Sequence, residues 1–216
     1  MRFFLISLFV GVSSLGTAQS TKVSTPEKVD LSTEEVQAIQ KKIKDRDAMS
    51  VSFDQVVYRN LRKTTTTKAG RAFFIKPNKF RWELDNDHWI FDGEKLFIYH
   101  PSQNEAVKYN STGPRSKELR HIVDMVLNVN SLFSNYQIKK ASQEKDILSV
   151  SLIPKKSEEI SQAELEIDLK LHYVRSIQLN LKGDNKTTFK FSHVKSIPKS
   201  DQILALPKTT KISEAL

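Results

Sequence analysis

The sequence predicts a mainly β fold with α-helical additions, in which a single antiparallel sheet follows the chain as a curved or closed meander. Three observations predict it. From Met49 onward, apolar and polar residues alternate with a period of two, as in strands with one buried face. Short polar turns separate the alternating segments. No regular alternation of strand and helix suggests a parallel sheet.

The N-terminus predicts export. Arg2 precedes the apolar run Phe3–Val12, and the small residues Gly16-Thr17-Ala18 resemble a cleavage site. The run is shorter than the roughly 20 residues of a transmembrane helix, and its flanks are those of a secretory signal peptide rather than of a buried helix. The expected organisation is a signal peptide over 1–18, a flexible segment over 19–30 and one soluble domain over 31–216.

The first element of the domain is expected to be a helix beginning at residue 32. Ser32 and Glu35 have the spacing of a capping box, with Ser32 as the N-cap. Val36, Ile39 and Ile43 then recur at helical spacing. The apolar stripe is narrow, so this helix should lie on a larger element.

The strands are read from the alternation and from the turn residues. The threonines Thr64–Thr67 fit either a sheet edge or a loop, and Asp92-Gly93 is typical of the tight turn of a hairpin. The expected strands and hairpin cover residues 49–53, 70–76, 80–84, 88–100, 148–152, 165–171, 177–181 and 187–193.

One helical segment interrupts the meander after Gly113-Pro114. It carries apolar residues on one helical face, which are Leu119, Ile122, Val123, Val126 and Leu127. A helix inserted between strands of one sheet must pack on a surface. We expect that surface to be the concave apolar face of the sheet.

Composition narrows the partners only a little. The chain has 216 residues, no cysteine and a formal charge of +9, and loss of Arg2 with the signal peptide leaves 33 basic against 25 acidic residues, or +8. Stability must therefore come from the core and not from disulfides. The basic charge fits anionic partners such as phospholipid headgroups, but the lysines are dispersed, which equally fits a role in solubility.

The residue patterns offer no place for covalent chemistry. The five histidines never have metal-ligand spacing, and neither a G-x-S-x-G motif nor a glycine-rich phosphate loop is present. Glu164, Glu166 and Asp168 lie two residues apart, which places them on the solvent face of a strand. Arg81 and Trp82 would point to opposite faces of a strand, so they would not form a nucleic-acid stacking platform. We expect no catalytic residues, metal, cofactor or nucleic-acid partner.

Several motifs resemble a known family. "SFDQ" at Ser52–Gln55, "KPNKFRW" at Lys76–Trp82 and "DGEKLFIYHP" at Asp92–Pro101 follow the expected signal peptide and capped helix in the order found in LolA proteins. These are the periplasmic carriers of outer-membrane lipoproteins in Gram-negative bacteria. The motifs cover roughly Ser50–Pro101, and the later strands agree in order more than in residues.

The resemblance implies one antiparallel sheet rolled into an unclosed half-barrel, with the N-terminal helix and the inserted helix as a lid over an apolar cavity for acyl chains. It implies a monomer that receives acylated lipoproteins from an inner-membrane LolCDE-like ABC complex and passes them to a LolB-like acceptor or directly to the outer membrane. The aromatic and aliphatic residues expected at the cavity are Phe80, Trp82, Leu84, Trp89, Phe91, Leu96 and Ile98.

Three of these assignments come from matching positions. Lys76 falls where well-known members have an arginine that holds the lid closed and permits release, although a lysine does not make the same forked hydrogen bonds. Phe80 matches an aromatic residue near the mouth that is linked to ligand entry, and Trp82 matches a cavity aromatic.

Two alternatives stay open. The residues expected at the cavity equally fit a filled core, because strand direction alone does not say which apolar face is hollow. In function, a lipid-sensing regulatory module with the same half-barrel is the second hypothesis, and a secreted enzyme is the third.

Overall fold

A computed structural model of the chain describes residues 27–28, 41, 47–109, 125–126, 135–156 and 159–215. The expected signal peptide, the flexible segment apart from residues 27–28, and the expected N-terminal helix apart from the helical residue Lys41 lie outside these ranges. Within the described residues, no helix combines the length and apolar character needed to cross a bilayer.

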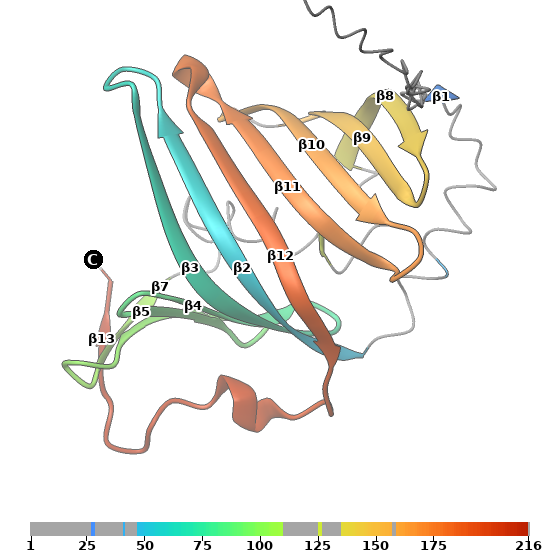
Figure 1. Ribbon diagram of the computed structural model, residues 1–216. Helices are drawn as coiled ribbons and strands as arrows, with labels where there is room; N and C mark the ends of the chain where they lie inside the picture. The colour runs from blue at the N-terminus through green and yellow to red at the C-terminus, as the bar shows by residue number, and fades with distance from the viewer. Residues whose placement is uncertain are drawn as a thin grey trace, which may run out of the picture.

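The described strands form one sheet, which curls around an interior (Figure 1). Its order is β1-β8-β9-β10-β11-β12-β2-β3-β4-β5-β6-β7-β13. The strands are β1 (Glu27–Lys28), β2 (Ala48–Arg59), β3 (Thr64–Ile75), β4 (Lys79–Leu84), β5 (Asp87–Phe91), β6 (Leu96–His100), β7 (Glu105–Tyr109), β8 (Tyr136–Glu144), β9 (Ile147–Pro154), β10 (Ile160–Asp168), β11 (Tyr173–Leu181), β12 (Lys186–Ser196) and β13 (Lys211–Glu214). Two 3-10 turns, η1 (Lys182–Asp184) and η2 (Asp201–Leu204), complete the described elements.

The prediction of a wholly antiparallel sheet is wrong at one pairing. β13 runs parallel to β7, with Ile212 opposite Ala106. Hairpins impose antiparallel pairing on neighbouring strands, but β13 is joined to β12 by the long connection 197–210. That connection passes over the outside of the sheet, so the last strand reaches the far edge running in the same direction as β7.

Several strands differ from the sequence-based prediction in extent or existence. The threonine run belongs to β3, which begins at Thr64 and pairs with β2 along its whole length. β10 ends at Asp168, earlier than predicted, because the Asp168 carboxylate accepts the backbone N–H groups of Lys170 and Leu171 and turns the chain. The sequence did not predict β1, β7, β8 or β13.

A close approach of backbone and ring fixes the packing of β2 on β3. Gly70 lies directly opposite Phe53 in the register, and the Phe53 ring covers the glycine. A Cβ atom at position 70 would lie 2.5 Å from the Glu83 carbonyl oxygen and would also collide with that ring. Only glycine fits this point of the sheet.

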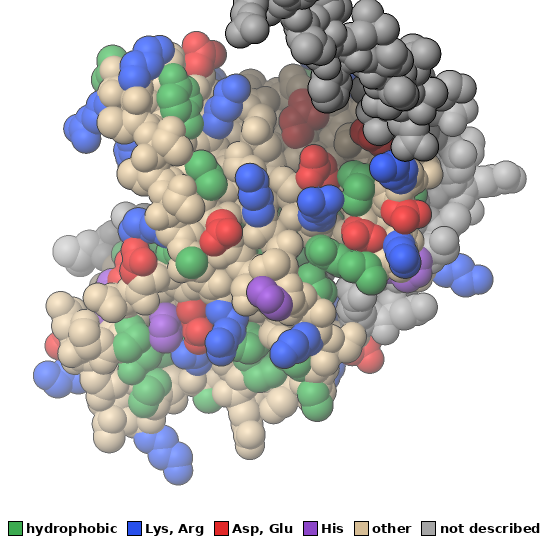
Figure 2. All heavy atoms as spheres, in the orientation of Figure 1, with side chains coloured by type: hydrophobic (Ala, Val, Ile, Leu, Met, Phe, Trp, Pro, Cys, Tyr) green, Lys and Arg blue, Asp and Glu red, His purple; other side chains and the backbone are tan. Residues whose placement is uncertain are grey.

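The core is divided between the two faces of the sheet. The larger, inner cluster joins buried residues of β2–β6 with those of β8–β12. The smaller, outer cluster contains Ala48, Ile75, Ile90, Tyr99, Ala106 and Leu204. In Figure 2 the outer face of β2, β11 and β12 is mostly polar, which agrees with one buried face per strand.

Candidate functional site

An aromatic cluster shows how strongly the sheet is curved. Trp82 on β4 and Phe189 on β12 are three strands apart in the sheet order, a separation of about 14 Å in a flat sheet. Their ring centroids are nevertheless 5.3 Å apart, in a T-shaped arrangement. The ring centroid of Phe53, on the intervening β2, lies 4.1 Å from that of Trp82. The rings therefore meet inside the curl of the sheet, and the inner face is concave.

The register places the residues expected at the cavity on one face. Phe80 pairs with Phe91, and Trp82 pairs with Trp89 across β4 and β5. Trp89 in turn pairs with Ile98, and Phe91 with Leu96, across β5 and β6. Cross-strand partners point to the same side of a sheet, so these residues share a face, and Leu84 joins them by alternation along β4.

This shared face is the inner one. Six of the seven residues pack in or against the inner cluster, and Ile98 is buried on the same face beside Trp89. Phe80 and Trp82 are 1% exposed, and Trp89 is half-buried. The register therefore places these residues on the inner face, and their role in lining a cavity for a ligand stays a prediction.

Sequence reasoning missed the other half of the inner face as a site. There the lining is aliphatic and comes from β9, β10 and β11, with Val150, Leu165 and Ile177 at its centre. Phe53, Phe74, Phe189 and Phe191 complete the aromatic part around Trp82. The period-two alternation marked most of these positions as buried, but nothing in the sequence indicated that they face Trp82.

The expected lid helix is described at only two positions. Met125 and Val126 are helical, are 0% and 4% exposed, and belong to the inner cluster. These two helical residues between β7 and β8 therefore pack on the concave face, and the role of Val126 in a lid stays a prediction. The other residues of the predicted lid face, Leu119, Ile122, Val123 and Leu127, lie outside the described residues.

One polar atom is buried within the apolar interior. The indole Nε1 of Trp82 has no hydrogen-bond partner among the residues that the structure describes. A buried N–H without an acceptor is unfavourable by about 1–3 kcal/mol. The group is a donor only, so an acceptor such as a carbonyl oxygen would satisfy it.

Lys76 lies at the entrance to the turn between β3 and β4. Its backbone N–H donates to the Asp47 carbonyl oxygen at 2.9 Å, and its bond to Pro77 is cis. Its side chain is half-buried. The predicted role of Lys76 in lid closure depends on residues outside the described ranges and stays a prediction.

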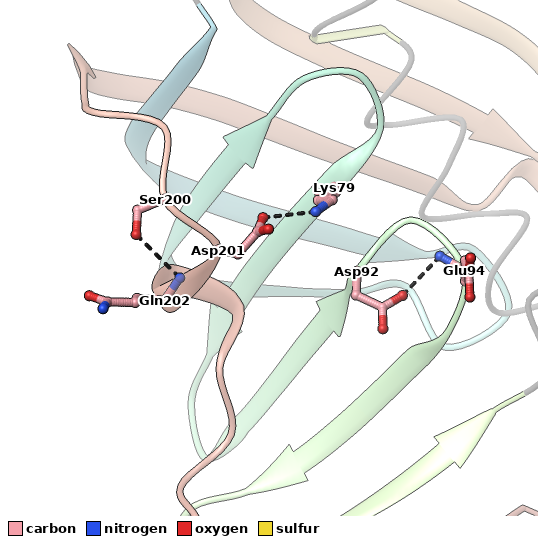
Figure 3. A network of polar contacts seen from close by, with 6 residues as sticks. All are labelled: Lys79, Asp92, Glu94, Ser200, Asp201 and Gln202. Atoms are coloured by element: carbon pink, nitrogen blue, oxygen red, sulfur yellow. Dashed lines mark hydrogen bonds and ion pairs between the residues drawn. The ribbon is translucent and has the colours of Figure 1, made fainter.

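The outer face of β4 is held to the C-terminal segment by polar contacts. Lys79 Nζ pairs with the Asp201 carboxylate at 2.8 Å, and the Ser200 hydroxyl accepts the N–H of Gln202 at the start of η2 (Figure 3). Deeper on the same face, an Arg81 guanidinium nitrogen donates to the Ile203 carbonyl oxygen at 3.3 Å. Leu204, the residue after Ile203, packs into the outer cluster.

Arg81 also contacts His88 on β5. It donates to Nδ1 of His88 at 3.0 Å and pairs with Glu83 at 2.7 Å. Burial lowers the pKa of His88 below 6.5, with opposing effects from Glu83 and Asp87 and a further lowering by Arg81. No group of three or more His, Asp or Glu side chains in the described part of the chain is arranged to hold a metal ion.

The architecture defines a class of protein, a half-barrel binding fold whose strongly curved sheet presents an apolar inner face. A family model described as "Outer membrane lipoprotein carrier protein LolA" matches residues 44–204. The chain belongs to this family, whose members are periplasmic. The resemblance drawn from the sequence motifs is thereby confirmed.

Solved structures resemble this chain at low sequence identity. A conserved protein from Thermus thermophilus is 11% identical with a TM-score of 0.55, over 84% of this chain and 98% of that one. A LolA superfamily protein from Nitrosomonas europaea is 10% identical (TM-score 0.42, 79% and 97% covered), and a putative outer membrane lipoprotein-sorting protein domain from Vibrio parahaemolyticus is 9% identical (TM-score 0.44, 79% and 97% covered). No curated protein matches the sequence.

Proposed function

We propose that this protein is a periplasmic carrier that takes up the acyl chains of lipoproteins on the inner face of its sheet and shuttles them from the inner to the outer membrane. The observation that carries the proposal is the continuous apolar lining of the concave face, which both halves of the sheet supply. Membership of the LolA family supports it.

The chemistry of the cargo explains why the lining should be apolar and almost free of polar anchors. Each methylene of an acyl chain in water costs about 0.8 kcal/mol, so a multiply acylated protein does not cross an aqueous compartment uncovered. The periplasm has no ATP to drive release. Non-directional apolar contacts suit both uptake and release of the acyl chains, because the interior of a membrane offers the chains similar contacts at a similar free energy.

In this proposal the acyl chains displace the helical segment that occupies the inner face. Met125 and Val126 now fill space among the strands, and an alkyl chain has a similar cross-section and polarity. The cavity is lined by the seven residues expected there from the sequence, which are Phe80, Trp82, Leu84, Trp89, Phe91, Leu96 and Ile98. The helix that carries Leu119, Ile122, Val123, Val126 and Leu127 acts as the lid. We assign Lys76, at the β3–β4 turn, to lid closure and release.

The indole of Trp82, which has no acceptor among the described residues, fits a cargo that has carbonyl groups as well as alkyl chains. Diacylglyceryl esters and N-acyl amides carry such oxygens at the head of each chain. A hydrogen bond from Nε1 would orient the chain and remove an unfavourable buried donor.

Export and exchange of cargo complete the proposed route. The signal peptide over residues 1–18 would deliver a monomer to the periplasm. A LolCDE-like ABC complex would load it, and a LolB-like acceptor or the outer membrane itself would unload it. We infer a binding role and assign no catalytic residue.

A transfer assay with a fluorescent acylated peptide tests the proposal. Delipidated protein should bind the peptide in a detergent-free buffer, should ignore the same peptide without acyl chains, and should release it to acceptor vesicles. Trp82→Phe keeps an aromatic ring but lacks the N–H, so its affinity should fall about fivefold, the value of one neutral hydrogen bond. Failure of the wild-type protein to prefer the acylated peptide would refute the carrier function.

Lys76→Leu separates release from uptake in the same assay. If Lys76 tunes opening of the lid, this variant should change the rate of transfer to vesicles more than the affinity for the peptide. Equal changes in both would remove that role from Lys76.

A further inference from the structure

The far end of the β2–β3 hairpin stands clear of the rest of the sheet on one side. β3 pairs with β4 only from Gly70 to Ile75, so the preceding stretch from Thr64 to Ala69 pairs with β2 alone within the described residues. Each residue of that stretch is exposed. On its other side β2 stays paired with β12 along this stretch. The outer half of β3 therefore forms an exposed edge of the sheet at the top of the molecule, and the hairpin turn lies beside the β11–β12 turn (Figure 1).

The tip of this hairpin carries an exposed leucine. Leu61 is 95% exposed, the largest value among the exposed large hydrophobic residues of the described chain. The turn that carries it is ordered: the Lys63 N–H donates to the Asn60 carbonyl oxygen at 3.2 Å, and the Asn60 N–H donates to Asn185 Oδ1 at 3.0 Å. The second bond ties the tip to the neighbouring β11–β12 turn, so Leu61 is held outward on a fixed support.

Basic side chains surround the leucine. Arg59, Arg62 and Lys63 are exposed within two residues of it, and no acidic residue occurs between Asp54 and Glu83 in the sequence. The adjoining β11–β12 turn adds exposed Lys182 and Lys186 against the single acid Asp184. Figure 2 shows blue and green side chains together at the upper left, over these two turns.

We propose that this tip docks the protein on an anionic phospholipid surface, with Leu61 entering the boundary between headgroups and acyl chains and Arg59, Arg62 and Lys63 contacting phosphates. A single large apolar side chain among cations suits a membrane surface. Each basic side chain is attracted to the anionic headgroups independently, and the leucine needs no matching pocket to enter the bilayer. A protein partner requires a contiguous contact surface with a buried centre, which one leucine does not supply. The inference rests on the hairpin and holds whether or not acyl chains enter the inner face.

Co-sedimentation of the cargo-free, full-length mature protein with vesicles tests the proposal. Binding is compared between vesicles of phosphatidylethanolamine with one-third phosphatidylglycerol and vesicles of phosphatidylcholine alone. The protein should bind the anionic vesicles, and binding should fall steeply as salt is raised, because screening weakens exposed charges. Comparable binding to neutral vesicles, or no binding to either, would overturn it.

Matched variants locate the contact. Leu61→Ser should weaken binding about tenfold through lost apolar burial, and Arg62→Ser with Lys63→Ser should weaken it about thirtyfold at low salt. Leu171→Ser, at a 54% exposed leucine at the other end of the sheet, and Lys195→Ser with Lys199→Ser should bind like the wild type. Equal losses in the control variants, or none in the tip variants, would contradict docking through the tip.

The assay separates this inference from the carrier function. The tip variants are exposed and should keep the wild-type circular dichroism and thermal unfolding, and they should take up acylated peptide normally when no vesicles are present. If the wild-type protein binds anionic vesicles but not acylated peptide, docking stands and the carrier function fails. If tip variants lose peptide uptake without vesicles, the tip belongs to cargo binding and the docking role is refuted.

Discussion

The two faces of β4 and its neighbours are built on opposite principles. On the inner face, Phe80 and Trp82 meet other rings and aliphatic chains, and the one buried donor has no partner among the described residues. On the outer face, Lys79 and Arg81 alternate with them in sequence and hold the C-terminal segment by an ion pair and hydrogen bonds. Neighbouring residues of one strand thus alternate between an apolar inner surface and a polar outer surface that binds the C-terminal segment.

This difference separates contacts that fix a segment from contacts that permit exchange. Hydrogen bonds have strict geometry, so the C-terminal segment has one place on the outer face. Apolar contacts depend on area and fit, so an alkyl chain substitutes for Met125 or Val126 without a specific partner being lost. The comparison leads to four predictions, given from the largest expected effect to the smallest.

The inner face should tolerate a charge on its helix but not on its strands. Val126 and Val150 are both 4% exposed in the inner cluster, one on the helical segment and one on β9. Val150→Asp should unfold the protein, since an unpaired buried carboxylate costs roughly 4 kcal/mol or more. Val126→Asp should keep the strand signal in circular dichroism and lose retention of acylated peptide, because its helix can leave the face.

Global unfolding of Val126→Asp would break the comparison. The helical segment would then be a permanent part of the core, and acyl chains would need another route into the half-barrel.

Crowding of the inner face at Gly70 should be the next largest effect. Gly70→Ala should lower the free energy of unfolding by about 3 kcal/mol, because the new Cβ meets both the Phe53 ring and the β4 backbone. Urea unfolding of Gly70→Ala and of the double variant with Phe53→Leu measures the coupling. A smaller side chain at position 53 should recover part of the loss, and strict additivity of the two losses would show that the ring is not the obstacle.

Attachment of the C-terminal segment to the outer face should depend more on the buried Leu204 than on the Lys79–Asp201 ion pair. Leu204→Ala should cost about 2 kcal/mol, since it empties part of the outer cluster. Lys79→Ala should cost about 0.5 kcal/mol or less, because Asp201 is largely exposed and solvent screens the pair. Thermal unfolding of the two variants provides the test, and a larger loss from Lys79→Ala would reverse this ranking.

Acid should weaken the outer face through His88. Burial lowers the pKa of this imidazole in the folded protein, so the unfolded chain binds the proton more readily. The stability that depends on neutral His88 is complete above pH 6.5 and declines as the pH falls below it, when Nδ1 no longer accepts from Arg81. Urea midpoints between about pH 7.5 and 5 should decline less steeply in His88→Gln than in the wild type.

The matched control is His193→Gln, at an exposed position on β12. This variant should keep the wild-type pH dependence. If His193→Gln flattens the profile as much as His88→Gln does, the decline does not come from the outer face of β4.

Much of the fold could be predicted from the alternation of apolar and polar residues alone. The same alternation predicted which residues share one side of a strand. Phe80, Trp82 and Leu84 were expected on one side of their strand, and they are. Alternation failed where both faces are buried: Trp89, Ile90 and Phe91 are all apolar because the C-terminal segment covers the outer side of β5. No local pattern reveals a covering segment that lies so far along the chain.

Other features escaped prediction for physical reasons that are equally specific. β8 has a register shift between Ile138 and Lys140, which breaks the period of two in a strand already poor in apolar residues. The meeting of Trp82 with Phe189 depends on the curvature of the whole sheet, which local sequence does not encode. Leu61 at the tip is not part of any periodic apolar pattern, so the sequence does not distinguish it, and only its exposure in the structure identifies it.

The parallel strand β13 has a consequence for limited proteolysis. By pairing with β7, it becomes the edge strand of the sheet in place of β7. β13 has four residues, two of them the charged Lys211 and Glu214, and short charged edge strands disfavour pairing with another molecule. Cleavage within the exposed stretch 207–209 would separate β13 from the rest of the chain, so a clipped molecule should expose the edge of β7 more often and associate more readily through it.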